Sequence, residues 1–226
     1  KFKDDLDAEY TTPLFVNESL ELRKKISDLD LPALKKIMKI SDKMASKVFD
    51  LYHTNHPQFG CAILSYSGIA FQYMAPGIFT DDQLEYIDKH LRIVSGLYGI
   101  VRPFDQIEEY RLEMQTKLPF PPYSLYEFWN DKIASALEDD LIINLASEEY
   151  AKCVRPYKSL IDVRFLDHDG KEKGVYVKMA RGEMVRFMAE NHITDPEKLK
   201  LFDRQGYRYD EKASTETTYV FRKEKS

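Results

Sequence analysis

The segment from Leu34 to Ala45 constrains the fold more than any other part of the sequence. Apolar side chains recur there at helical spacing in two groups, namely Leu34, Ile37 and Met38 and then Met44, Ala45, Val48 and Phe49. Five residues separate the groups, and among them Ile40 is placed as the buried plug of a turn. Asp42 follows as a cap for the second helix. The pattern predicts two helices joined by a tight turn over about residues 31–50.

Lysines surround this predicted turn, at positions Lys35, Lys36, Lys39, Lys43 and Lys47. The amide groups at a helix start attract anions, and nearby lysines add to that attraction. The segment is similar to a helix-hairpin-helix motif, although Lys39-Ile40-Ser41 stands where such a hairpin usually has Gly-hydrophobic-Gly. One interpretation is a site for nucleic-acid phosphate formed by Lys35, Lys36, Lys39, Ile40, Ser41, Lys43 and Lys47. The other is an ordinary helix pair with solvated lysines.

Composition limits which of these interpretations are compatible with the chain. The chain has 226 residues, of which 43% are hydrophobic and 13% aromatic, so it can bury a sizeable core. Its net charge of −5 means that a nucleic acid would have to meet a local basic surface. Cys61 and Cys153 form no CxxC pair, which is typical of a reducing compartment. We find no apolar run of roughly 18–20 residues and no signal-peptide pattern in the charged start, Lys1 to Asp5.

Periodicity and turn residues predict a mixture of helices and strands. Helices are expected within 13–30, after Thr80, over 125–137, from Ser147, over 178–190 and from 195 to 202. Strands are expected at 61–65 (continuing near 68–74), 93–101, 110–118, 141–145, 161–166, 174–177 and 217–222, with a hairpin turn at 167–170. The irregular alternation predicts an α+β (mixed α/β) fold, and we expect residues 1–226 to form a single compact domain.

Several short peptides carry a more specific signal. They are 40–43 (Ile-Ser-Asp-Lys), 90–99 (His-Leu-Arg-Ile-Val-Ser-Gly-Leu-Tyr-Gly), 102–105 (Arg-Pro-Phe-Asp), 110–114 (Tyr-Arg-Leu-Glu-Met), 125–129 (Leu-Tyr-Glu-Phe-Trp), 143–147 with 149–150, 178–184 (Lys-Met-Ala-Arg-Gly-Glu-Met) and 206–207. In this order the peptides resemble the YaaA family of peroxide-stress proteins. The family opens with a strand ending in Ser-Pro-Ala-Lys, which the given sequence does not include.

The resemblance implies a compact fold with an embedded helix-hairpin-helix element. It also implies binding of double-stranded DNA in the cytoplasm and a role in limiting iron-driven damage under peroxide. We expect no cofactor and no membrane association. The hairpin interpretation from residue chemistry and the DNA binding implied by the resemblance fall on the same segment.

A second candidate surface lies in or beside these peptides. Its charged residues are Arg92, Arg102, Arg111, Glu113, Lys178, Arg181 and Glu183. Arginine forks suit phosphate oxygens, so one interpretation is a cleft that meets nucleic acid. The other is a set of structural ion pairs with neighbouring carboxylates. An Arg/Glu cleft also leaves open a nucleic-acid-acting enzyme, although the sequence contains no GxxxxGK[ST], GxSxG or HExxH motif.

His53, His56 and Cys61 raise a third possibility, an iron-handling protein. Imidazole and thiolate are ligands for iron or zinc. Their spacing matches no structural-zinc pattern, and we expect no metal site. Catalytic residues and oligomeric state cannot be assigned from the sequence.

Overall fold

The computed structural model describes residues 9–224, so the charged start from Lys1 to Asp5 lies outside the described residues. The chain groups into two compact units, each formed from separate stretches of sequence. Unit 1 comprises the chain as far as Ser65 together with Arg92–Glu138 and Glu148–Tyr157. Unit 2 comprises Tyr66–Leu91, Asp139–Ser147 and the chain from Lys158 onward. The α+β expectation is confirmed, and the expectation of a single domain stays a prediction.

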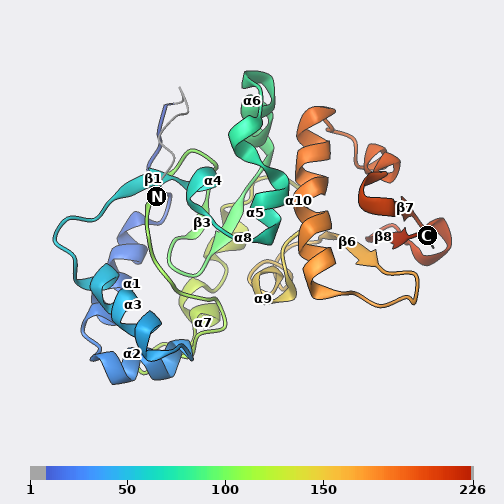
Figure 1. Ribbon diagram of the computed structural model, residues 1–226. Helices are drawn as coiled ribbons and strands as arrows, with labels where there is room; N and C mark the ends of the chain where they lie inside the picture. The colour runs from blue at the N-terminus through green and yellow to red at the C-terminus, as the bar shows by residue number, and fades with distance from the viewer. Residues whose placement is uncertain (1–8, 225–226) are drawn as a thin grey trace. The chain divides into compact units, whose positions relative to one another are not determined.

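Unit 1 is mainly helical. Its elements are α1 (Val16–Ser27), α2 (Leu31–Met38), α3 (Asp42–His53), β1 (Phe59–Cys61), α4 (Ala62–Ser65), β2 (Ile93–Ser95), β3 (Gly99–Val101), β4 (Gln106–Glu108), α7 (Leu125–Trp129), α8 (Lys132–Ser135) and α9 (Glu148–Ala151) (Figure 1). The strands form two antiparallel pairs, β1 with β4 and β2 with β3. Each pair is short, so the unit is held together by side-chain packing more than by sheet hydrogen bonds.

Trp129 anchors this packing. Its indole is fully buried and donates a hydrogen bond of 3.0 Å to the carbonyl of Gly96. A Cβ at Gly99 would stand 2.8 Å from the Trp129 ring, and Gly99 has φ 69°. The glycine therefore both admits the indole and turns the chain, because this conformation is costly for other residues. The run 93–101, predicted as one strand, is in fact the hairpin of β2 and β3.

Unit 2 contains a four-stranded sheet of order β5-β6-β8-β7. Its elements are α5 (Ile69–Met74), η1 (Pro76–Ile78), α6 (Asp81–His90), β5 (Ile143–Asn144), β6 (Ile161–Leu166), α10 (Gly174–Glu190), η2 (Pro196–Leu201), η3 (Arg204–Gly206), β7 (Tyr207–Tyr209), η4 (Glu211–Ala213) and β8 (Thr218–Lys223). Strand β6 runs parallel to both β5 and β8, whereas β7 is antiparallel to β8. The core lies between the sheet and α10 and includes Phe165, Met184 and Phe221.

The expected strand at 174–177 is wrong, because those residues form the first turn of α10. The turn at 167–170 is present, and its shape is set by Gly170 with φ 79°. Both edges of β6 are, however, already paired with β5 and β8, which come from distant parts of the chain. A hairpin pattern in the local sequence cannot show that strands from distant segments compete for the edges of β6.

Other strand predictions also fail. Residues 62–65 and 69–74 are the helices α4 and α5, and 110–118 form no regular strand. Alternate side chains in 110–118 are nevertheless buried, including Leu112, Met114 and Leu118, because the irregular segment packs on the core without a ladder partner. The predicted helix over 125–137 breaks at Asn130, which has φ 45°. Within 141–145 only Ile143 and Asn144 form a strand.

Candidate functional site

The predicted helix pair is present in unit 1. Helix α2 ends at Met38, and Lys39 adopts the left-handed conformation (φ 52°, ψ 47°) that closes the helix. Its amide donates a hydrogen bond to the carbonyl of Lys35. Ser41, not Asp42, is the N-cap of α3, and its hydroxyl accepts a hydrogen bond of 3.4 Å from the amide of Met44. The connection is three residues long, as the sequence predicts.

Burial around the turn follows the prediction in part. Ala45 and Val48 are buried as expected, whereas Met44 is 38% exposed and Ile40 is half-buried. Met44 lies in the first turn of α3 next to the exposed residues Asp42 and Lys43, so its side chain meets solvent. That the element is a nucleic-acid-binding helix-hairpin-helix stays a prediction.

The lysines around the turn divide into two groups. Lys35 pairs with Asp42 at 2.5 Å and Lys47 pairs with Glu109 at 2.6 Å. Within residues 9–224, no ion pair involves Lys36, Lys39 or Lys43, and all three are exposed. The excess positive charge of the hairpin is therefore carried by these three, which we call the lysine triad.

The start of α3 also offers hydrogen-bond donors. The first amide groups of a helix have no acceptor inside the helix. The amides of Met44 and Ala45 are satisfied by the side chain and the carbonyl of Ser41. The amides of Asp42 and Lys43 have no acceptor in the described part of the chain. Donors and cations thus occur together in the exposed turn.

The proposed arginine cleft falls in both units. Arg92, Arg102, Arg111 and Glu113 belong to unit 1, and Lys178, Arg181 and Glu183 belong to unit 2. Arg102 binds Asp105 at 2.9 Å, Arg111 binds Glu113 at 2.7 Å, and Glu183 pairs with Arg204 at 3.2 Å. Burial lowers the pKa of Arg181, whose Nε has no hydrogen-bond partner among the described residues, while Lys178 is exposed. Convergence of the seven on one cleft stays a prediction.

The possible metal ligands have separate surroundings. His53 stacks on Phe49 and contacts its carbonyl at 2.8 Å, whereas His56 is exposed. Cys61 is buried, and its thiol donates to the carbonyl of Pro103. Across the described residues, no group of three or more His, Cys, Asp or Glu is placed to hold a metal ion. No described helix has both the length and the apolar character needed to cross a membrane.

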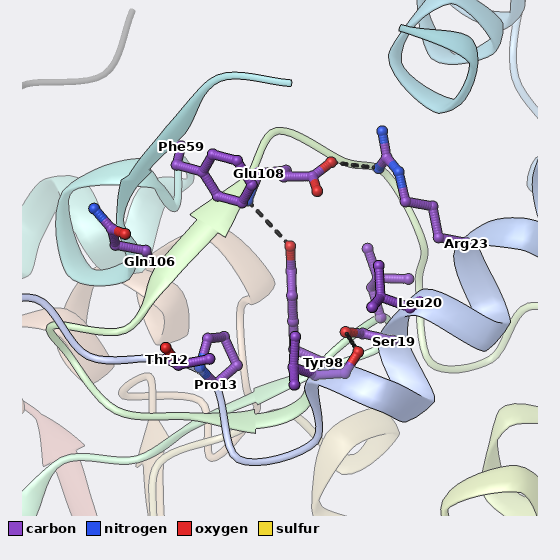
Figure 2. A pocket seen from close by; sticks show the side chains of 11 residues that line it. Thr12, Pro13, Ser19, Leu20, Arg23, Phe59, Tyr98, Gln106 and Glu108 are labelled. Atoms are coloured by element: carbon purple, nitrogen blue, oxygen red, sulfur yellow. Dashed lines mark hydrogen bonds and ion pairs between the residues drawn. The ribbon is translucent and has the colours of Figure 1, made fainter. Parts of the chain in front are cut away.

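Unit 1 contains a hollow that the sequence pattern did not predict. Its walls come from α1, from the β1–β4 pair and from Tyr98, and its volume is about 200 Å³ (Figure 2). Arg23 of α1 and Glu108 of β4 form an ion pair of 2.7 Å at its edge, with side chains only 15% and 11% exposed. A second hollow shares the same two residues as part of its lining. We call the first the Arg23–Glu108 hollow.

The ion pair is held by a network of neighbours. Arg23 also donates 2.6 Å to the carbonyl of Leu51, and its guanidinium lies 5.4 Å from the Tyr52 ring centroid. The Tyr98 hydroxyl accepts a 3.1 Å bond from the amide of Glu108. Burial raises the pKa of the Glu108 carboxyl, and the charge of Arg23 opposes that shift. Burial likewise raises the pKa of Tyr98 to about 12. Buried, perturbed groups beside a cavity are typical of binding sites.

A weak signal for this site is present in the sequence. Val16, Ser19, Leu20 and Arg23 recur at helical spacing, so an arginine stands at the end of a partly apolar stripe. Nothing local connects that arginine with Glu108, because the pair forms only when α1 meets β4.

Comparisons with known proteins agree on one family. The family model described as "Peroxide stress protein YaaA" matches residues 1–213. A UPF0246 protein of Agathobacter rectalis is 43% identical, covering 92% of this chain and 89% of the relative. A UPF0246 protein of Desulfitobacterium hafniense is 42% identical, covering 97% and 94%. One of Lactobacillus helveticus is 52% identical over 171 residues, covering 71% and 68%. This chain therefore belongs to the YaaA family of peroxide stress proteins.

Proposed function

We propose that this protein binds double-stranded DNA without sequence specificity through the α2–α3 hairpin, and that this binding serves the response to peroxide. The observation that carries the proposal is the lysine triad beside the open amides of Asp42 and Lys43. Such a surface complements a phosphate group, because the amides donate hydrogen bonds and the lysines supply charge. The family description supports the link to peroxide stress.

The geometry favours phosphate contact over base reading. Lys36, Lys39 and Lys43 are flexible point charges, and the turn presents amide donors but no planar side chain that could match a base edge. The net charge of −5 restricts attraction to this local surface. Binding through a few phosphates is weak and depends strongly on salt.

A link to iron follows from the same physics. Duplex DNA holds a layer of condensed cations, and each phosphate that a lysine neutralises releases some of them. Ferrous ions held in that layer would generate radicals next to the DNA when they meet peroxide. Occupation of phosphates by the hairpin displaces such ions. The proposal places the protein in the cytoplasm, where a DNA partner and two free thiols are compatible.

The test is a duplex titration by fluorescence anisotropy at two salt concentrations. Lys39→Glu with Lys43→Glu reverses two charges of the triad and should abolish binding. The control is Lys24→Glu with Lys152→Glu, which changes net charge equally at exposed positions outside the hairpin. Wild type and control should bind with a log–log salt slope of about −3, as roughly three phosphate contacts predict. Unchanged binding by a folded hairpin variant would remove the hairpin from the function.

A further inference from the structure

The β1–β4 register places two unlike side chains together. Phe59 stands directly opposite Glu108 in this antiparallel pair. Opposite residues in such a pair project from the same face of the sheet. Phe59 is 50% exposed although it is a large apolar residue, whereas the charged Glu108 is 9% exposed. This reverses the usual preference, in which aromatic side chains are buried and carboxylates are exposed. Both residues line the Arg23–Glu108 hollow.

Helix α1 supplies the opposite wall. Val16, Ser19, Leu20 and Arg23 follow at the i, i+3, i+4 and i+7 positions, so they share one face of the helix. Figure 2 shows Leu20 and Arg23 on α1, with the Glu108 carboxylate and the Tyr98 hydroxyl between them and Phe59. The hollow thus has apolar and aromatic sides, and its two charged groups, Arg23 and Glu108, lie together at one end.

The polar end has unused hydrogen-bonding capacity. An ionised carboxylate can accept several hydrogen bonds. Arg23 is the side-chain partner of Glu108 in the described part of the chain, and it contacts Oε2. This ion-pair contact is not a formed hydrogen bond, because Oε2 is a buried atom without a hydrogen-bond partner among the described residues. The Tyr98 oxygen accepts from the Glu108 amide, which leaves its own O–H free to donate. A buried acceptor without a donor is costly, so a ligand with N–H groups would be favoured.

Charge and shape further restrict the chemical class of ligand that the hollow can bind. A second cation on Glu108 would be repelled by Arg23, which already neutralises it at 2.7 Å. The ligand is therefore neutral. The exposed Phe59 ring favours a flat heterocycle, because every nucleobase can stack on an aromatic face. Two adjacent N–H donors on one edge of that ring would match a carboxylate. Among the common bases guanine has this edge, whereas adenine presents a ring nitrogen acceptor beside its amino group.

We propose that the Arg23–Glu108 hollow binds a guanine base, with Glu108 accepting from the base edge and Phe59 stacking on its face. The base can come from a free nucleoside or from an unpaired position in a nucleic acid. The site is separate from the lysine triad, so it does not depend on DNA binding by the hairpin.

The experiment is a ligand-observed NMR titration of the full chain with guanosine and with adenosine. Guanosine should bind at least about 10-fold more tightly, because the adenine edge would leave Glu108 facing a lone pair. Phe59→Ala should weaken guanosine binding by about 5- to 150-fold, the range for loss of one base–aromatic stack. The control Tyr123→Ala removes a comparably exposed ring, 62% exposed, outside the hollow and should have no effect. Equal affinity for both nucleosides, or full binding by Phe59→Ala, would overturn the proposal.

A second variant tests the carboxylate itself. Glu108→Gln keeps the shape and leaves one oxygen to accept from Arg23, so thermal unfolding will report whether the fold is retained. A carboxamide pairs with adenine through one donor and one acceptor. The preference for guanosine should therefore shrink or reverse in this variant. An unchanged preference in a folded variant would exclude Glu108 as the reader of the base edge, and the proposal would fail. Binding of N-acetylarginine amide by a protein that binds no guanosine would overturn the proposal and indicate a guanidinium partner instead.

Two further measurements identify the source of the base. A duplex with one unpaired guanine is compared with the same duplex carrying an unpaired adenine. Tighter binding of the guanine duplex assigns the site to nucleic acid, whereas equal binding alongside guanosine selectivity assigns it to the free nucleoside, and both results support the site. The Lys39→Glu, Lys43→Glu variant should retain guanosine binding even where duplex binding is lost. Failure of the hairpin function and failure of the guanine site are thereby distinguished.

Discussion

Gly182 of α10 lies against the backbone of Ala70 in α5. A Cβ at Gly182 would stand 2.0 Å from the carbonyl oxygen of Ala70. In unit 2 the two helices approach closely here because Gly182 has no side chain, and Figure 1 shows α10 beside α5. Since backbone cannot move away as a side-chain tip can, this contact sets the distance between the helices.

Gly182→Ala should destabilise the protein by about 1–3 kcal/mol or more, as overpacking does elsewhere. The gain in helix propensity is at most about 1 kcal/mol and does not offset the clash. The matched control is Gly174→Ala in the same helix, where an added Cβ meets nothing within 4 Å. That variant should stay within about 0.5 kcal/mol of wild type. Urea unfolding of both proteins gives the comparison, and equal stability would show that the helices can separate freely.

Asp167 links the end of β6 to the start of α10 through charge. Its carboxylate pairs with Lys173 and accepts a 2.7 Å bond from the amide of His168. The bond from Lys173 is the main cause that lowers the pKa of Asp167 from 3.8, and the His168 amide adds to it. A carboxyl whose pKa is lower in the folded than in the unfolded state stabilises the protein at pH values above the unfolded pKa. That stabilisation is lost as the pH falls through the folded pKa.

Asp167→Asn should therefore be less stable than wild type at neutral pH. The difference should shrink as the pH is lowered below about 3.8, because the unfolded carboxyl is then protonated while the folded one, with its lowered pKa, is still ionised. Asp169→Asn is the control, because Asp169 is exposed and, within residues 9–224, accepts a hydrogen bond only from the amide of Lys171. Thermal unfolding across pH 3 to 8 would show the trend. A difference that stays constant down to the lowest pH would contradict it.

Neither cysteine is placed to sense peroxide. Cys61 and Cys153 are 1% and 4% exposed, and burial raises the pKa of both thiols, that of Cys153 to about 12. Thiolate, which is the form that reacts, is therefore scarce at neutral pH. A thiol reagent should label the native protein slowly and the urea-unfolded protein fast. Rapid labelling of one thiol in the native protein would contradict this prediction and support a redox role for that cysteine.

Asp42 weakens the proposed phosphate site because it brings a negative charge to the hairpin. It neutralises Lys35 at 2.5 Å and is itself largely exposed. Asp42→Asn should raise duplex affinity by about two- to fivefold at low salt, the scale of one screened charge at a few ångströms. Asp50→Asn, in the same helix, is the control. Unchanged affinity in the Asp42 variant would place the phosphate elsewhere.

Local signals in the sequence were reliable where the structure uses local interactions. The helix after Thr80 begins with a capping box in which Gln83 contacts the amide of Thr80, as the sequence pattern indicates. The prediction of a helix pair around the lysine triad is also confirmed, and Asp30 and Ser41 cap its two helices. Alternation predicts strand β6, and the strand predicted at 217–222 corresponds to β8. In each case the deciding contacts lie within a few residues.

Patterns within the sequence are enough to predict the mixed fold, the lysine-rich helix pair and the resemblance to the YaaA family. Long-range contacts set which strands pair with β6, and residues 174–177 form the start of α10 instead of a β-strand. Tertiary structure also decided the Arg23–Glu108 hollow, whose two charges are far apart in the chain and meet at 2.7 Å. Periodicity and capping report interactions with near neighbours, whereas burial of a charge and competition for a strand edge depend on segments that only folding brings together.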